Sequence, residues 1–104
     1  MSRVEAQAQT TTRVRLAYEI ELNRVPKTIA ERLAEMLPGS VDLDAYEIYD
    51  PAVDRYITLS EWFEGFYIVS VGVSEDRKEV YVVAGLDIPE WTNVELALYV
   101  FTPE

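Results

Sequence analysis

The sequence predicts an α+β domain: a strand, a helix and an antiparallel meander, giving about five strands with one helix packed on one face. Three observations predict this class. A segment near the N-terminus alternates apolar and polar residues, the next has apolar residues at helical spacing, and the remainder is rich in β-branched and aromatic residues between turns. With 104 residues the chain suits a single core, so we assign 12–104 to one domain and 1–11 to a flexible N-terminal arm.

The first expected strand, TRVRLAYEIEL at 12–22, has the clearest pattern in the chain. Val14, Leu16, Tyr18, Ile20 and Leu22 stand at alternate positions, with mostly charged residues between them. Because successive side chains of a strand point to opposite faces, these five should share the core face.

A helix should follow, beginning near Pro26 and ending at Pro38-Gly39. Proline suits the first helical position, and a Pro-Gly pair ends a helix. The stripe expected to pack on the sheet has an i, i+4, i+7, i+8 spacing. It consists of Ile29, Leu33, Met36 and Leu37.

The segment SVDLDAYEIYDP at 40–51 is ambiguous between a strand and a short helix. Val41, Leu43 and Ala45 alternate as in a strand, whereas Tyr46 and Ile48 have the opposite parity. We favour a strand with a bulge near Ala45.

The C-terminal part should be a β-meander. Two β-branched and aromatic runs within 66–86 are joined by the polar SEDRK and predict a hairpin, and VELALYVFT at 94–102 predicts the last strand. The second strand of this hairpin and the last strand also carry apolar residues on a second face of the sheet, which one helix cannot cover. We expect this face to form a homodimer, the alternative being that loops or the arm cover it. The residues of this predicted self-association face are Tyr81, Val83, Tyr99 and Phe101.

The composition excludes several chemistries. The chain has no cysteine and no histidine, so disulfides, thiolate nucleophiles, cysteine-based metal sites and histidine general bases are excluded. No signal peptide or membrane-spanning stretch is visible, so we expect a cytoplasmic protein. We also expect that it is not an enzyme and takes no metal or other cofactor.

The charge is the most informative number. The formal net charge is −10, and residues 33–104 hold fifteen acidic and three basic side chains. A field of this sign repels nucleic acid and anionic membranes and attracts cationic partners. Solubility alone is the competing explanation.

The stretch DPAVDRYITLSE at 50–61 resembles the calcium-binding loop of the EF-hand family. The resemblance implies a calcium site with ligands at the first, fifth, seventh, ninth and twelfth positions. Those positions hold Asp50, Asp54, Tyr56 (through its carbonyl), Thr58 and Glu61.

The same stretch departs from the family pattern at two positions. Ala52 offers no ligand oxygen at the third, and Arg55 replaces the glycine of the sixth. The alternative interpretation is a turn, a short strand RYITL and a one-turn helix capped by Ser60.

Two functional hypotheses follow. In the first, the protein is an acidic interaction module that binds a basic protein surface, and its carboxylates replace nucleic-acid phosphates. Small acidic proteins of this kind resemble phage-encoded inhibitors, such as anti-CRISPR and anti-restriction proteins, and immunity proteins that block nuclease toxins. The resemblance implies a partner with a cationic nucleic-acid-binding site. The residues of the predicted acidic face are Asp42, Asp44, Glu47, Asp50, Asp54, Glu61 and Glu64.

In the second hypothesis the protein is a structural or accessory subunit, such as a virion component, that self-associates through its apolar sheet face. The charge would then serve only to keep it in solution.

Overall fold

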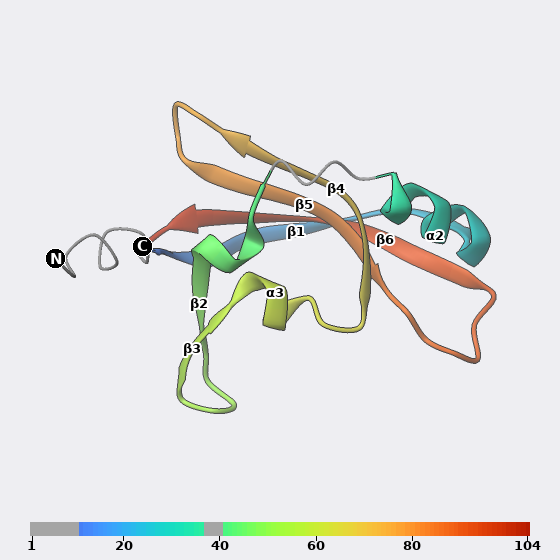
Figure 1. Ribbon diagram of the computed structural model, residues 1–104, viewed down its shortest axis with the longest axis horizontal. Helices are drawn as coiled ribbons and strands as arrows, with labels where there is room; N and C mark the ends of the chain where they lie inside the picture. The colour runs from blue at the N-terminus through green and yellow to red at the C-terminus, as the bar shows by residue number, and fades with distance from the viewer. Residues whose placement is uncertain (1–10, 37–40) are drawn as a thin grey trace, which may run out of the picture.

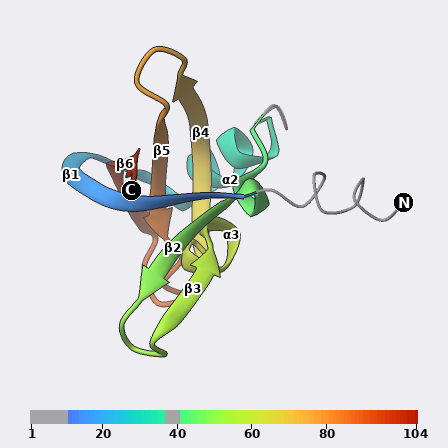
Figure 2. The same cartoon turned by 90° about the vertical axis from the view of Figure 1, so that its left-hand side faces the viewer.

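The structure is a computed structural model that describes residues 11–36 and 41–104. Strands make up 58% of the described residues. They form one mixed sheet in the order β3-β2-β1-β6-β5-β4, which twists strongly and curls into a half-barrel (Figure 1, Figure 2). The strands are β1 (Thr12–Pro26), β2 (Tyr46–Asp50), β3 (Arg55–Thr58), β4 (Phe66–Ser74), β5 (Glu79–Leu86) and β6 (Asn93–Pro103).

The predicted five-strand antiparallel meander is therefore wrong. The long strand β1 lies inside the sheet, antiparallel to β6 along most of its length and parallel to β2 at Thr12–Val14. The parallel pair arises because the chain leaves the far end of β1, passes through a helix and returns to its beginning. Parallel neighbours need such a crossover connection. β2 and β3 then form an antiparallel hairpin, which brings the number of strands in the sheet to six.

A bulge in β1 overturns the predicted single apolar face of 12–22. Leu16 lies opposite Phe101, but the register shifts after it, and Tyr18 lies opposite Val100. One extra residue, Ala17, occupies the shift, so the side chains that follow move to the other face until a second register shift between Glu21 and Arg24. Val14 and Leu16 face the core, whereas Tyr18, Ile20 and Leu22 are exposed.

The core fills the concave face of the sheet and is covered by α3 (Leu59–Trp62) and the 3₁₀ turn η1 (Leu43–Ala45). Phe101 and Leu59 are its largest completely buried side chains. Around Phe101 lies a group of aromatic rings, with centroid separations of 5.5 Å to Trp62 and 5.8 Å to Phe63. These rings meet edge to face, the arrangement that their quadrupoles favour.

In the ambiguous segment 40–51 the favoured strand with a bulge near Ala45 is only partly correct: Leu43–Ala45 form the 3₁₀ turn η1, and the strand β2 begins at Tyr46. The predicted turn, short strand and one-turn helix of 50–62 are present as the β2–β3 turn, β3 and α3. The cap of α3, however, is Thr58 and not Ser60. Thr58 and Glu61 form a reciprocal capping box, in which each side chain bonds the other's backbone N–H.

The helix α2 (Lys27–Glu35) packs near one end of the sheet against β4, β1 and β6. Its predicted apolar stripe is not the packed side: Ile29, Leu33 and Met36 are 46%, 39% and 73% exposed, and the buried residue is Ala30. Ala30 and the half-buried Lys27 and Ala34, at i, i+3 and i+7, therefore form the packed side. Leu37, like residues 1–10 of the predicted arm, lies outside the described residues.

The predicted hairpin of 66–86 is confirmed as β4 and β5, and the predicted last strand as β6. None of the helices in the described ranges is long and apolar enough to cross a membrane.

Tyr67 joins the start of β4 to α2, and its titration offers a test of this contact. Its hydroxyl donates to Glu31 Oε2 at 3.2 Å. Desolvation and this hydrogen bond raise the pKa of Tyr67 from 10.0 to about 12. The raised folded-state pKa means that its contribution to stability is fully present below pH 10 and is lost as the pH rises through about 12.

We therefore expect the free energy of unfolding of Tyr67→Phe to fall less steeply with pH over this interval than that of the natural chain. Chemical unfolding at a series of alkaline pH values measures both slopes. Equal slopes for the two proteins would contradict the raised pKa of Tyr67 in the folded chain.

Candidate functional site

Residues 41–64, comprising η1, β2, β3 and α3, form a unit that we call the acidic lobe. α3 contacts η1, β2 and β3, so the unit is held together from within. It carries seven carboxylates and one basic side chain, Arg55. The carboxylates are those of the predicted acidic face: Asp42, Asp44, Glu47, Asp50, Asp54, Glu61 and Glu64.

Several of these carboxylates also hold the local backbone. Asp42 caps η1 by accepting from the N–H of Asp44 at 2.9 Å, and Asp50 accepts from the N–H of Ala52 at 3.0 Å. Asp54 accepts from the Tyr49 hydroxyl, which raises the pKa of that tyrosine. Local hydrogen bonds therefore orient these three carboxylates of the lobe.

One carboxylate of the lobe has a cationic partner. Arg13 Nε lies 3.5 Å from Glu47 Oε1, and the Arg13 guanidinium stacks 3.8 Å from the centroid of the Tyr56 ring. In the described part of the chain no lysine or arginine forms an ion pair with the other six. Of these six, all but Asp50 are exposed.

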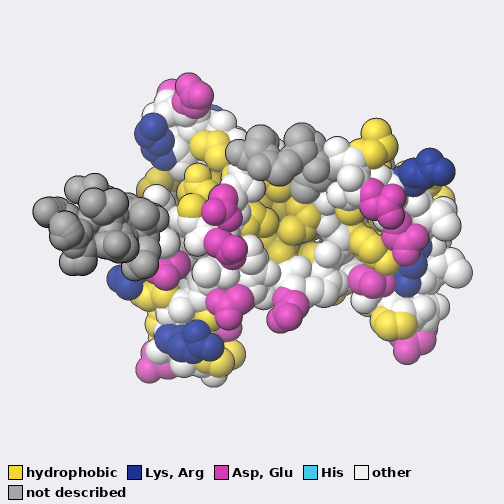
Figure 3. All heavy atoms as spheres, in the orientation of Figure 1, with side chains coloured by type: hydrophobic (Ala, Val, Ile, Leu, Met, Phe, Trp, Pro, Cys, Tyr) yellow, Lys and Arg dark blue, Asp and Glu magenta, His cyan; other side chains and the backbone are white. Residues whose placement is uncertain are grey.

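Outside the lobe, bases are more frequent, and four of the eleven described acids pair with one. Arg24 pairs with Glu95 at 2.6 Å and Lys27 with Asp87 at 3.1 Å. Arg77 lies 3.0 Å from Glu79, whose pKa is lowered by a hydrogen bond from Tyr81 and by this arginine. Figure 3 shows carboxylates beside the hydrophobic centre of the visible face, and carboxylates next to cationic side chains at its right end. The sequence signal, an acidic stretch almost without bases, thus corresponds to a spatial unit.

The fold does not gather the ligands of the EF-hand resemblance. Asp50 lies opposite Arg55 at the closed end of the β2–β3 hairpin, whereas Thr58 lies three pairs away, opposite Glu47. Three strand residues span about 10 Å, and Glu61 lies beyond them in the capping box of α3. No group of three or more acidic, histidine or cysteine side chains in the described ranges is placed to hold a metal ion.

The predicted self-association face does not form one surface. Tyr99 and Phe101 are 9% and 0% exposed and belong to the core. Tyr81 and Val83 lie opposite Val100 and Leu98 in the β5–β6 pair, and these β6 residues alternate with Tyr99 and Phe101. The two pairs therefore point to opposite faces of the sheet.

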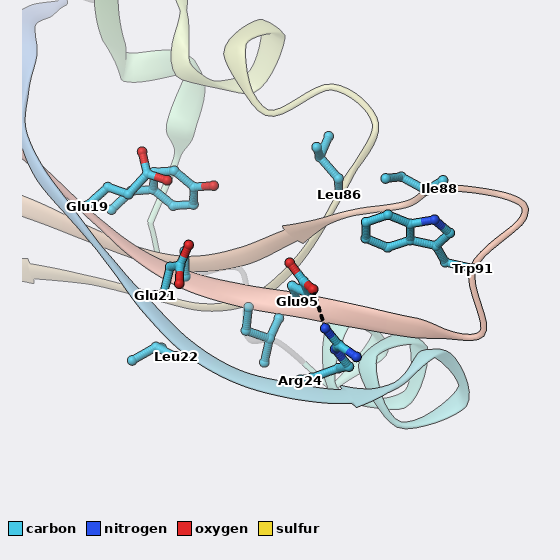
Figure 4. Close-up of a pocket in the computed structure, with 11 residues that line it drawn as sticks. Glu19, Glu21, Leu22, Arg24, Leu86, Ile88, Trp91 and Glu95 are labelled. Carbon is cyan, nitrogen blue, oxygen red and sulfur yellow. Dashed lines mark hydrogen bonds and ion pairs between the residues drawn. The ribbon is translucent and has the colours of Figure 1, made fainter.

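A hollow that the sequence did not predict lies on the concave face, beside the core. It has a volume of about 360 Å³ and lies between β1, β6 and the chain that joins β5 to β6. Figure 4 shows Glu19 and Glu21 on β1, and Leu86, Ile88 and Trp91 on the far side. Trp91 is 47% exposed, so the hollow has an aromatic wall open to solvent.

The hollow carries negative charge. Its one arginine, Arg24, pairs with Glu95, and no described base forms an ion pair with Glu19 or Glu21. Burial raises the pKa of Tyr99, which lines the hollow, and the nearby charge of Glu19 adds to the shift. Plain alternation places Glu19 and Glu21 in solvent on the outer face, and only the bulge at Ala17 brings them here.

Searches against protein-family models, curated proteins and solved structures find no match to this chain.

Proposed function

We propose that the protein is an interaction module whose acidic lobe binds a cationic surface of another macromolecule. The observation that supports it most is the local excess of negative charge. The lobe has seven carboxylates and one arginine, and only Glu47 has a described ion-pair partner, whereas the described residues outside the lobe hold eleven acidic and seven basic side chains, and four of those acids are paired. Unpaired carboxylates on one folded unit keep their field available for a partner.

The partner that fits this surface presents arginine and lysine side chains at a spacing suited to anionic oxygens. Exposed carboxylates on η1 and α3 meet such groups in charge-assisted hydrogen bonds, as phosphates would. A basic nucleic-acid-binding site is a surface of this kind, and the module would inhibit it by occupying it. Such binding weakens as salt rises, because the Debye length falls to about 10 Å at 0.1 M ionic strength.

Two variants of equal charge test the location of this surface. Asp44→Asn/Glu61→Gln/Glu64→Gln removes three carboxylates from the lobe, and Glu35→Gln/Glu75→Gln/Glu90→Gln removes three exposed ones elsewhere. Each changes the formal net charge from −10 to −7. Asp42 is left in place because it caps η1, and glutamine at 61 can still accept in the capping box.

On a resin carrying immobilised arginine, the lobe variant is expected to elute at clearly lower salt than the control variant. Both should elute before the natural chain. Circular dichroism verifies that each variant is folded. If the two variants elute together, net charge alone governs the contact, and the lobe is not the binding surface.

A further inference from the structure

We propose that the open edge of β1 binds an extended peptide of alternating basic and apolar residues, which joins the sheet as a further strand. This site is separate from the acidic lobe and uses none of its residues. Three features meet at the same place: an unpaired strand edge, two carboxylates on one face and two apolar side chains on the other.

The edge is long. β2 pairs with β1 only at Thr12–Val14, and beyond this no described strand pairs with that side of β1. Residues 17–24 are all exposed. An unpaired edge presents backbone donors and acceptors to any extended chain that approaches it.

Two hydrogen bonds establish which backbone groups point outward. Glu104 N donates to Arg13 O at 2.9 Å, and Lys27 N donates to Thr92 O at 2.8 Å. Residues 92 and 104 thus both direct their backbone groups to β1. Since this direction alternates along a strand, even-numbered residues of β6 face β1 and odd-numbered residues face β5.

The outward groups belong to the two glutamates of the hollow. Glu19 and Glu21 lie opposite the odd-numbered Tyr99 and Ala97. Directly opposed residues of an antiparallel pair either both bond each other or both point away. The N–H and C=O of Glu19 and Glu21 are therefore directed to the open edge.

The side chains on the two faces determine which peptide fits. Glu19 and Glu21 face the hollow, across from Trp91, whereas Tyr18 and Ile20 face the other side and are 51% and 46% exposed. An added strand places alternate side chains on these two faces. Lysine or arginine fits the first, its stem against the apolar wall and its charge at the carboxylates, and valine or isoleucine fits the second.

Charge also disfavours a second copy of this chain at the edge. A two-fold antiparallel pairing of β1 with itself puts the Glu19 and Glu21 side chains of both copies on the same face of the joined sheet. Arg24, the nearby base, already pairs with Glu95 at 2.6 Å. Like charges on neighbouring strands repel, whereas a basic peptide removes this repulsion.

The probe is a fluorescein-labelled Lys-Val-Lys-Val-Lys-Val peptide, which spans about 20 Å when extended, and binding is followed by anisotropy. Glu19→Gln/Glu21→Gln is expected to weaken binding about tenfold or more. Glu35→Gln/Glu90→Gln, an equal change of charge elsewhere, should stay within about threefold. The lobe variant used above should do the same, so this proposal and the proposed function can fail separately. Equal losses of peptide affinity in all variants would overturn the proposed site at the edge of β1.

Backbone methylation of the probe tests strand addition without altering the protein. In an antiparallel pairing the lysines lie opposite Glu19 and Glu21, so their amides face β1 and the valine amides face solvent. N-methylation of the lysine amides is expected to abolish binding, and N-methylation of the valine amides to leave it within about threefold. Equal effects of the two methylated peptides would overturn strand addition.

Sedimentation velocity tests whether a second copy of this chain, instead of a peptide, occupies the edge. If the natural chain is a dimer that the peptide does not dissociate, and if Glu19→Gln/Glu21→Gln tightens it, the edge belongs to a second copy and the peptide proposal is wrong. A monomer, or a dimer that the peptide dissociates, agrees with the proposal.

Discussion

Replacement of Phe101 by alanine is expected to lower the free energy of unfolding by about 3–5 kcal/mol. The side chain is completely buried, and its ring lies 5.5 Å from that of Trp62 and 5.8 Å from that of Phe63, measured between centroids. Both partners belong to the helix that closes the core or follow it directly, so the loss would detach α3 as well as leave a cavity. Against a total stability of about 5–15 kcal/mol for a small domain, this change approaches complete unfolding.

Urea or thermal unfolding followed by circular dichroism measures the change. Phe101→Leu keeps part of the volume and should cost clearly less. Trp91→Ala removes a larger aromatic that is 47% exposed, and it should change stability little by comparison. Equal costs for Phe101→Ala and Trp91→Ala would contradict the placement of the core.

Replacement of Gly85 by alanine should be the second most damaging change. A Cβ at this position would lie 2.4 Å from Val94 Cγ1 and 2.6 Å from the backbone oxygen of Glu95. Val94 is completely buried, and the oxygen belongs to the backbone of β6, so neither can move away easily. We expect a loss of at least about 1–3 kcal/mol through overpacking.

Gly72→Ala is the matched control for this position. Gly72 also lies in a strand, and an added Cβ there meets no atom within 4 Å. Since alanine is less flexible than glycine in the unfolded chain, this variant should gain about 0.4–1 kcal/mol. The same unfolding measurements serve both variants, and a Gly85→Ala protein as stable as Gly72→Ala would refute the close approach of β5 and β6.

Local patterns predicted the parts of the fold that depend on local chemistry. SEDRK between two β-branched runs gives the β4–β5 hairpin, and the proline at 26 precedes α2. The topology was missed because it depends on contacts distant in sequence. The parallel pairing of β1 with β2 involves only Thr12–Val14, and these residues carry no signal that distinguishes a parallel from an antiparallel neighbour.

Of the two candidate sites, the acidic lobe could be predicted from the sequence and the hollow could not. The acidic lobe was visible because its carboxylates cluster in the sequence and the fold keeps the segment 41–64 together. The hollow was invisible because Glu19 and Trp91 are far apart in the chain, and because the bulge reverses the face on which Glu19 stands. Tyr99 and Phe101 were assigned to a partner for a related reason: α3, four residues long, covers the face that the larger helix leaves open.

The additional residue at Ala17, the first of two register shifts in β1, reverses the faces on which the next side chains stand. Before it, apolar positions of the strand point into the protein, and after it the same periodicity points them outward and turns the glutamates inward. The hollow is thus acidic because of the register of β1 against β6 as well as because of the side chains themselves. Loss of that one alanine would exchange the two faces of β1 at residues 18–21 without altering any other amino acid.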